Sequence, residues 1–156
     1  MSKNEQLSTE AITMDVRRLT DELAVAPQIS VADVAELKAA GFCSVICNRP
    51  DGESMEQVAF AEIETAAKAA GLEIVWQPIM QGGLSDESAE QFGEIVDGLP
   101  KPVLAYCKSG TRCAALWSLS EAKERPLEDI IKRTAEAGYD FRGLMRRLEA
   151  IKGSAA

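Results

Sequence analysis

The chain has 156 residues, of which 46% are hydrophobic and 27% charged, the composition of one globular domain. Its formal net charge is −8 and it has no basic block, so neither nucleic acid nor an anionic membrane surface is expected as a partner. No run approaches the roughly 18 apolar residues of a membrane span, and the polar first residues lack the apolar segment of a secretory signal. We therefore expect a cytoplasmic protein.

Histidine is absent from the sequence, which excludes a Ser-His-Asp triad, a Cys-His dyad and any histidine metal ligand. An acid–base step must then use Asp, Glu, Lys, Tyr or Cys. The cysteines do not have the spacing of zinc sites or thioredoxins, and we expect them to be thiols: Cys43, Cys47, Cys107 and Cys113. Neither a metal nor a cofactor is expected.

Residues 11–152 are expected to form a single domain, because they contain no internal repeat, linker or low-complexity tract. The polar start (1–10) and the end of the chain (153–156) are expected to be flexible tails.

The first part of the domain reads as strand, helix, strand. Residues 23–25 can form a first strand. Ser30 is expected to cap a helix that ends near Ala40, with Gly41 as its stop. Residues 42–47 are apolar and follow as a buried strand.

The middle of the chain repeats this order. Ser54 and Gln57 are predicted to form a capping box at the start of a second helix, which stops at Gly71. Residues 72–76 are the next strand, and Ser85 is predicted to cap a third helix.

The last predicted strand covers residues 102–106, and helices are expected over 113–123, 127–137 and 141–152. Strands separated by single helices imply right-handed crossovers and a parallel arrangement. The predicted fold class is α/β, a three-layer structure with helices on both faces of a mostly parallel sheet of about four or five strands.

The most unusual segment follows the last predicted strand and precedes a helix, where α/β sheets bind ligands. It reads Cys107, Lys108, Ser109, Gly110, Thr111, Arg112. Its small residues let successive backbone N–H groups turn toward one anion, and the helix start adds its positive dipole end. Arg112 offers a planar fork for two oxygens of that anion, and Lys108 adds a minor positive charge. In this field Cys107 is expected to be a thiolate nucleophile.

A simpler interpretation is that Cys107 is a buried thiol at the end of a strand, followed by an ordinary turn. Cysteine is among the most frequently buried residue types. The coincidence of a strand, a cysteine, small residues, an arginine and a helix favours the functional interpretation.

The loop resembles those of two cysteine-enzyme families, the protein tyrosine phosphatases and the rhodaneses. Conventional phosphatases place five residues between Cys and Arg, whereas four separate Cys107 from Arg112. Three stretches together, residues 48–53, 71–79 and 103–112, resemble the phosphatase-like domain of beta-lactamase-hydrolase-like proteins. That bacterial family has a tyrosine-phosphatase-like fold with the short loop.

This resemblance implies a cysteine-dependent phosphatase in which Cys107 attacks phosphorus and Arg112 grips the phosphate, with phosphorylated small molecules or phosphoproteins as substrates. Where conventional phosphatases carry a hydroxyl residue after the Arg, this chain has Cys113. Stabilisation of the leaving thiolate is then missing or comes from Ser109 or Thr111. The alternatives are a rhodanese-like sulfurtransferase with a persulfide on Cys107 and a weakly catalytic module that binds oxyanions or phosphoproteins.

The resemblance also implies an acid on the loop before the nucleophile's strand, and Asp86 occupies that position, although Asp is common in a first helical turn. Asp51 and Glu53 lie on the loop after an earlier strand and could act as the acid or as a clamp on Arg112, although a Pro-Asp-Gly turn needs no function. Cys47 or Cys113 could trap an oxidised nucleophile as a disulfide, or be merely buried.

Overall fold

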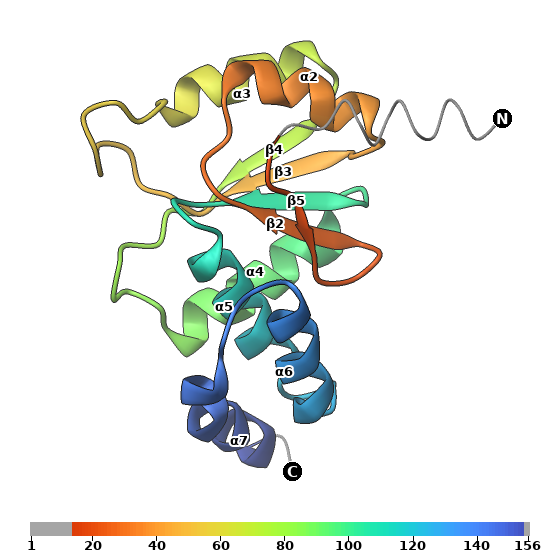
Figure 1. Cartoon of the computed structure of the whole chain (residues 1–156), viewed down its shortest axis with the longest axis vertical. Helices are drawn as coiled ribbons and strands as arrows, with labels where there is room; N and C mark the ends of the chain where they lie inside the picture. Colours follow the sequence, from red (N-terminus) through yellow and green to blue (C-terminus); the bar gives the residue numbers. More distant parts are fainter. Residues whose placement is uncertain (1–13, 155–156) are drawn as a thin grey trace, which may run out of the picture.

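The centre of the protein is a five-stranded sheet with helices on both faces, in a computed structural model that describes residues 14–154 (Figure 1). The strands are β1 (Arg17–Arg18), β2 (Leu23–Ala26), β3 (Ser44–Cys47), β4 (Glu73–Trp76) and β5 (Val103–Tyr106). Their order is β1-β2-β5-β3-β4, with β1 antiparallel to β2 and all other pairs parallel. This arrangement confirms the predicted mostly parallel α/β sheet.

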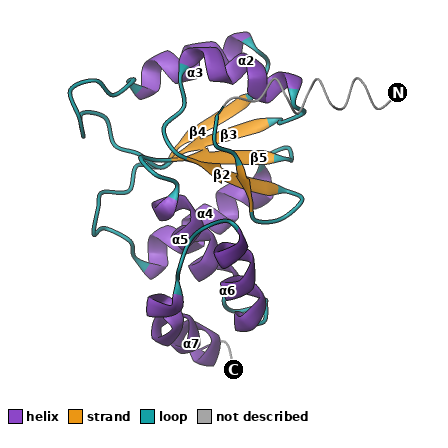
Figure 2. Cartoon of the chain, viewed as in Figure 1, coloured by secondary structure: helices purple, strands orange, loops and turns teal. Residues whose placement is uncertain are grey.

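Two groups of helices form the outer layers (Figure 2). Helices α2 and α3 cover one face, α4 and α5 cover the other, and α6 and α7 pack beyond α5. The bounds are α2 (Val31–Ala39), α3 (Phe60–Ala69), α4 (Asp86–Gly98), α5 (Thr111–Glu121), α6 (Leu127–Glu136), a 3-10 turn η1 (Arg142–Leu144) and α7 (Met145–Ser154).

The alternation of side chains along β5 divides the core in two. Leu104 and Tyr106 belong to the cluster under α2 and α3, whereas Val103 and Ala105 belong to the cluster under α4 and α5. Cys107, the next residue, continues on the α5 side and is fully buried. The end of β5 therefore places Cys107 next to the start of α5.

Two of the predicted helix starts are confirmed. The Ser30 side chain accepts the Asp33 N–H, and Ser85 accepts the N–H of Ser88. Each forms a reciprocal capping box, which satisfies N–H groups that the helix itself leaves unpaired.

The capping box predicted for Ser54 and Gln57 is wrong. Gln57 instead donates from its side chain to Pro50 O and accepts from the Glu53 N–H, so it ties the loop together rather than opening a helix. Helix α3 begins only at Phe60, whose N–H is accepted by Asp51 Oδ1 at 2.8 Å. A carboxylate nine residues earlier in the chain thus takes the capping role.

The domain boundaries expected from the sequence can be compared with the structure at the carboxyl-terminal end only. The tail expected at 1–10 lies outside the described residues, while α7 continues to Ser154, two residues beyond the expected domain end. Within residues 14–154, no helix has the length and apolarity that crossing a membrane requires.

The role of Asp51 at α3 gives a stability prediction. Asp51→Ala should lower the free energy of unfolding by about 1 kcal/mol, the usual cost of a lost helix cap. Ser54→Ala, on the same loop, should leave it unchanged because Ser54 does not cap the helix. Urea denaturation of both variants measures this difference, and equal stabilities for the two would contradict the assignment.

Candidate active site

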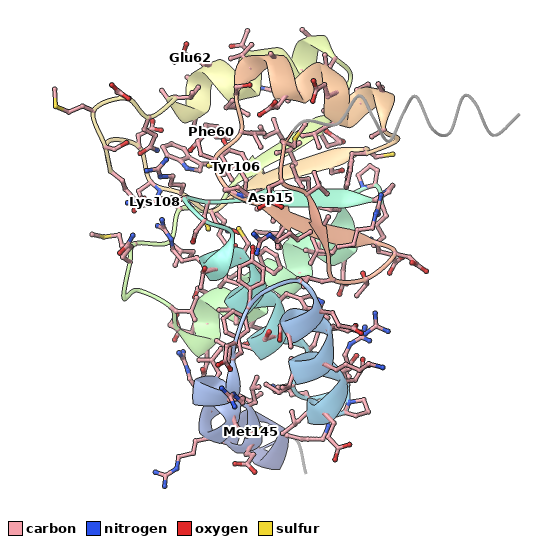
Figure 3. The ribbon with its side chains drawn as sticks, viewed as in Figure 1. Asp15, Phe60, Glu62, Tyr106, Lys108 and Met145 are labelled. Atoms are coloured by element: carbon pink, nitrogen blue, oxygen red, sulfur yellow. The ribbon has the colours of Figure 1, made fainter. Side chains whose placement is uncertain are left out.

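The loop after β5 lies at the carboxyl edge of the parallel strands, beside the chain segments that leave β2 and β3. The Gln28 N–H donates to Lys108 O at 3.3 Å, and the Asn48 N–H donates to Tyr106 O at 2.8 Å. The labels of Tyr106 and Lys108 in Figure 3 mark this end of β5. The site expected from sequence is therefore at the sheet edge where α/β proteins bind ligands.

The loop folds back on Cys107 through Gly110. This residue has φ +90°, a left-handed conformation that glycine adopts without steric cost, and it stands at the start of α5. Its N–H donates to Cys107 Sγ at 3.1 Å. The loop thus turns a backbone donor onto the sulfur, as expected for an anion nest.

Hydrogen bonds to the sulfur make Cys107 unusually acidic. Its pKa falls to about 5, chiefly because the Cys113 thiol donates to it, with further backbone N–H donors at Cys113, Ser109 and Gly110. These donors outweigh burial, which acts in the opposite direction. At neutral pH Cys107 is therefore a thiolate, the form that acts as a nucleophile.

Cys113 takes the place that a hydroxyl residue occupies in conventional phosphatases. Burial raises its pKa well above the usual range, so it remains a protonated donor. The Ser109 and Thr111 hydroxyls, one of the two alternatives for stabilising the thiolate, form a hydrogen bond with each other at 2.9 Å. The sequence interpretation missed this role of the second thiol.

Arg112 is held with one edge of its guanidinium occupied. Its Nη1 donates to Glu53 Oε2 and to Ile79 O, both at 2.8 Å, and its Nη2 donates to Glu53 Oε1 at 2.9 Å. These bonds use three of the five N–H donors of the group. Within residues 14–154 no acceptor is recorded for the Nε–H or the second Nη2–H, which lie on a common edge. That edge can bind two oxygens of an oxyanion.

Glu53 is the clamp on Arg112, one of its two predicted roles. It lies between Arg112 and Arg49, whose Nε donates to Glu53 Oε1 at 2.9 Å. These two arginines, Arg112 first, lower the pKa of Glu53 to about 2. A carboxylate that is ionised at neutral pH has no proton to donate, so Glu53 cannot be the acid.

Arg49 is a site residue to which the sequence interpretation assigned no role. Its side chain is buried, and Nη1 donates to Gln28 Oε1 at 2.9 Å. The available signal was a charged residue two positions after a buried strand and four positions before Glu53.

The two other predicted acids have partners of their own. Asp51 caps α3, as described above. Asp86 Oδ1 accepts from Arg147 Nη2 of α7 at 3.3 Å. It borders a hollow shared with Leu119, about two helical turns beyond Arg112 along α5, and with Lys123, which follows that helix.

The two candidate trapping cysteines differ in position. The Cys113 thiol donates a hydrogen bond to Cys107, and both residues pack in the same cluster. Cys47 packs in the cluster on the opposite face of the sheet, where its thiol donates to Arg49 O at 3.4 Å and burial raises its pKa. All four cysteines are free thiols.

The clamp gives a second prediction. Glu53→Gln should lower the free energy of unfolding at pH 7 by about 3 kcal/mol, because it leaves the buried Arg49 without its ionic partner. The depressed pKa of Glu53 means that this contribution is full above pH 4.5 and is lost as pH falls toward 2. Urea denaturation across that pH range should show this loss of unfolding free energy in the parent chain and not in Glu53→Gln.

Glu56→Gln on the same exposed loop is the matched control and should behave like the parent chain. A Glu53→Gln variant as stable as this control would contradict the clamp.

Comparison with known proteins agrees with this architecture. The sequence profile of the family described as "Beta-lactamase hydrolase-like protein, phosphatase-like domain" matches residues 15–124. A beta-lactamase hydrolase-like protein of Agrobacterium fabrum is 33% identical over 138 residues, which are 87% of this chain and 32% of that protein. The chain thus spans about a third of the length of this relative.

Solved structures show the same fold. A candidate phosphatase from Neisseria meningitidis is 33% identical, with a TM-score of 0.80 over 89% of this chain and 99% of its own. Tk-PTP in its active form has a TM-score of 0.67 at 17% identity, covering 89% of this chain and 97% of its own, a likeness of fold alone. The chain therefore belongs to the family of phosphatase-like domains of beta-lactamase hydrolase-like proteins and has a protein-tyrosine-phosphatase-like fold.

Proposed function

We propose that the chain is a cysteine-dependent phosphatase that hydrolyses phosphate monoesters of small molecules or proteins through a cysteinyl-phosphate on Cys107. The observation that carries this proposal is the pairing of a low-pKa thiolate with the unoccupied edge of Arg112. The hydrogen bonds to Glu53 raise the pKa of Arg112 most, and the charge of Cys107 raises it further, so the thiolate and the guanidinium interact electrostatically. A tetrahedral phosphate needs both a nucleophile for phosphorus and a fork for its oxygens.

In the first step Cys107 Sγ attacks phosphorus, and the bond from phosphorus to the ester oxygen breaks. The electron pair of that bond leaves with the oxygen, which takes a proton. The loop N–H groups and the Arg112 edge neutralise the charge of the transferring phosphoryl oxygens, the main contribution that a protein makes to phosphoryl transfer.

In the second step water attacks phosphorus and the sulfur–phosphorus bond breaks. Inorganic phosphate leaves, and Cys107 returns to the thiolate. The Cys113 thiol favours this step, because its hydrogen bond stabilises the departing sulfur anion.

Entry of the phosphoryl group requires a local opening, since the Cys107 side chain is fully buried. The exposed loop residues Lys108 and Ser109 are the boundary that must open, whereas the Glu53 clamp holds Arg112 in place. Such lid motions commonly limit turnover in enzymes.

Turnover of an aryl phosphate by the purified protein tests the covalent mechanism. Cys107→Ser should fold normally and lose essentially all activity, because the chain has no histidine that could activate a serine hydroxyl. Substantial activity in this variant would overturn the proposal.

A rhodanese-like sulfurtransferase is the second candidate, and the observation that favours it is that Asp51, Glu53 and Asp86 each bond to other groups. Attack of the Cys107 thiolate on the outer sulfur of thiosulfate gives a persulfide and releases sulfite, which needs no proton to leave. Cyanide then removes that sulfur as thiocyanate and restores the thiolate. Faster thiocyanate formation than phosphate release would favour this candidate, and oxyanion binding without either reaction would favour a binding module.

The position of Asp86 leads us to propose that solvent or substrate, rather than Asp86, protonates the leaving oxygen. Asp86→Asn should then change the rate by less than about twofold for both nitrophenyl and alkyl phosphates, whereas loss of a general acid costs about 10²–10⁴-fold on the poorer leaving group. A selective loss on alkyl phosphates would make Asp86 the acid.

A further inference from the structure

Tyr139 contacts the nucleophile loop from outside the segments that the proposed chemistry uses. It follows Gly138 in the connection between α6 and η1, which crosses in front of α5 in Figure 1. Its hydroxyl donates to Ser109 O at 3.2 Å, across thirty positions of sequence. It also lies against Gly110 so closely that a side chain there would collide with it.

The acceptor of this bond belongs to the same peptide unit that touches the nucleophile. Ser109 O and the Gly110 N–H are the two polar groups of one peptide bond, and they point in opposite directions because the bond is planar and trans. The oxygen accepts from Tyr139, and the N–H donates to Cys107 Sγ at 3.1 Å. Fixing one end of this peptide fixes the direction of the other.

Neighbouring groups hold the Tyr139 ring in place. The Arg17 guanidinium lies 5.2 Å from the ring centroid and donates from Nη1 to Ala137 O at 3.0 Å. The Phe141 ring stacks at 5.9 Å with an interplanar angle of 18°. Burial raises the pKa of Tyr139 to about 12, so the hydroxyl keeps its proton as a donor throughout the working range of an enzyme.

We propose that Tyr139 is a positioning residue for Cys107: its hydroxyl holds the Ser109–Gly110 peptide so that the Gly110 N–H points at the sulfur. This inference rests on the proposed role of Cys107 as the nucleophile. Within residues 14–154 the hydrogen bond of the Tyr139 hydroxyl goes to Ser109 O and not to the sulfur, so its positioning effect passes through the peptide. It extends the site to a connection that follows the residues matched by the family profile, which end at 124.

Tyr139→Phe tests this role, because it removes the hydroxyl and keeps the ring with its contacts to Arg17 and Phe141. The pH dependence of Cys107 alkylation by iodoacetamide, read on the Cys107 peptide by mass spectrometry, reports the thiolate directly. The parent chain should titrate near pH 5. The variant should titrate about one unit higher, a tenfold loss of thiolate at acid pH, which is the effect of one weakened hydrogen bond.

The other groups that act on Cys107 are unchanged in this variant: the Cys113 thiol, the Arg112 guanidinium and the Cys47 thiol. The acid limb of kcat/KM should therefore move upward with the alkylation profile. The Gly110 amide proton should also exchange with solvent several-fold faster, a local effect that NMR resolves even if global stability falls.

Tyr106→Phe is the matched control. It removes the same hydroxyl from the residue next to Cys107, but on the opposite face of the sheet, where no donor to the loop is lost. Its alkylation profile should equal that of the parent chain. An unshifted profile and unchanged Gly110 exchange in Tyr139→Phe would overturn the positioning role and leave the proposed function intact. A parent chain that titrates like an ordinary thiol, near pH 8.5, would overturn both.

Discussion

The site depends on the ion pairs of Glu53, which join three loops at one sheet edge. Glu53 stands on the loop after β3, Arg112 starts α5 after β5, and the same guanidinium reaches the carbonyl of Ile79 after β4. Arg49, on the same loop as Glu53, is the second arginine that pairs with its carboxylate. With one edge of Arg112 satisfied by protein, the other is directed before any ligand arrives, and this preorganisation is the main source of electrostatic catalysis.

The nucleophile depends on a second, smaller network around one sulfur. A thiol at Cys113 and backbone N–H groups of the loop share the negative charge of Cys107, while burial opposes that charge. The fold supplies these donors through its ordinary elements: β5 places the cysteine on the α5 side, and the left-handed Gly110 turns its amide inward. In our proposal Tyr139 holds that amide in place through its hydrogen bond to Ser109 O. The chemistry thus requires few residues, but each is fixed by the packing of several elements.

Local patterns predicted most of the fold, because the caps at Ser30 and Ser85 and the alternation of strands and helices are properties of neighbouring residues. The predicted capping box at Ser54 was wrong because the Gln57 side chain bonds to Pro50 O and the Glu53 N–H instead. These partners are set by the folded loop and not by the local sequence pattern. The placement of Cys107 and Arg112 on a loop between a strand and a helix was likewise predictable from a contiguous motif. The partners of Glu53 and the contact of Tyr139 with the loop were not, since they join positions far apart in the chain.

The most direct test of the central claim is to identify what becomes attached to Cys107 during turnover. The protein is mixed with an aryl phosphate, quenched in acid within one turnover, digested and analysed by mass spectrometry. The proposed function predicts a phosphoryl group on the Cys107 peptide that disappears as phosphate is released. An unmodified Cys107 during sustained phosphate release, or a phosphoryl group on another residue, would contradict it.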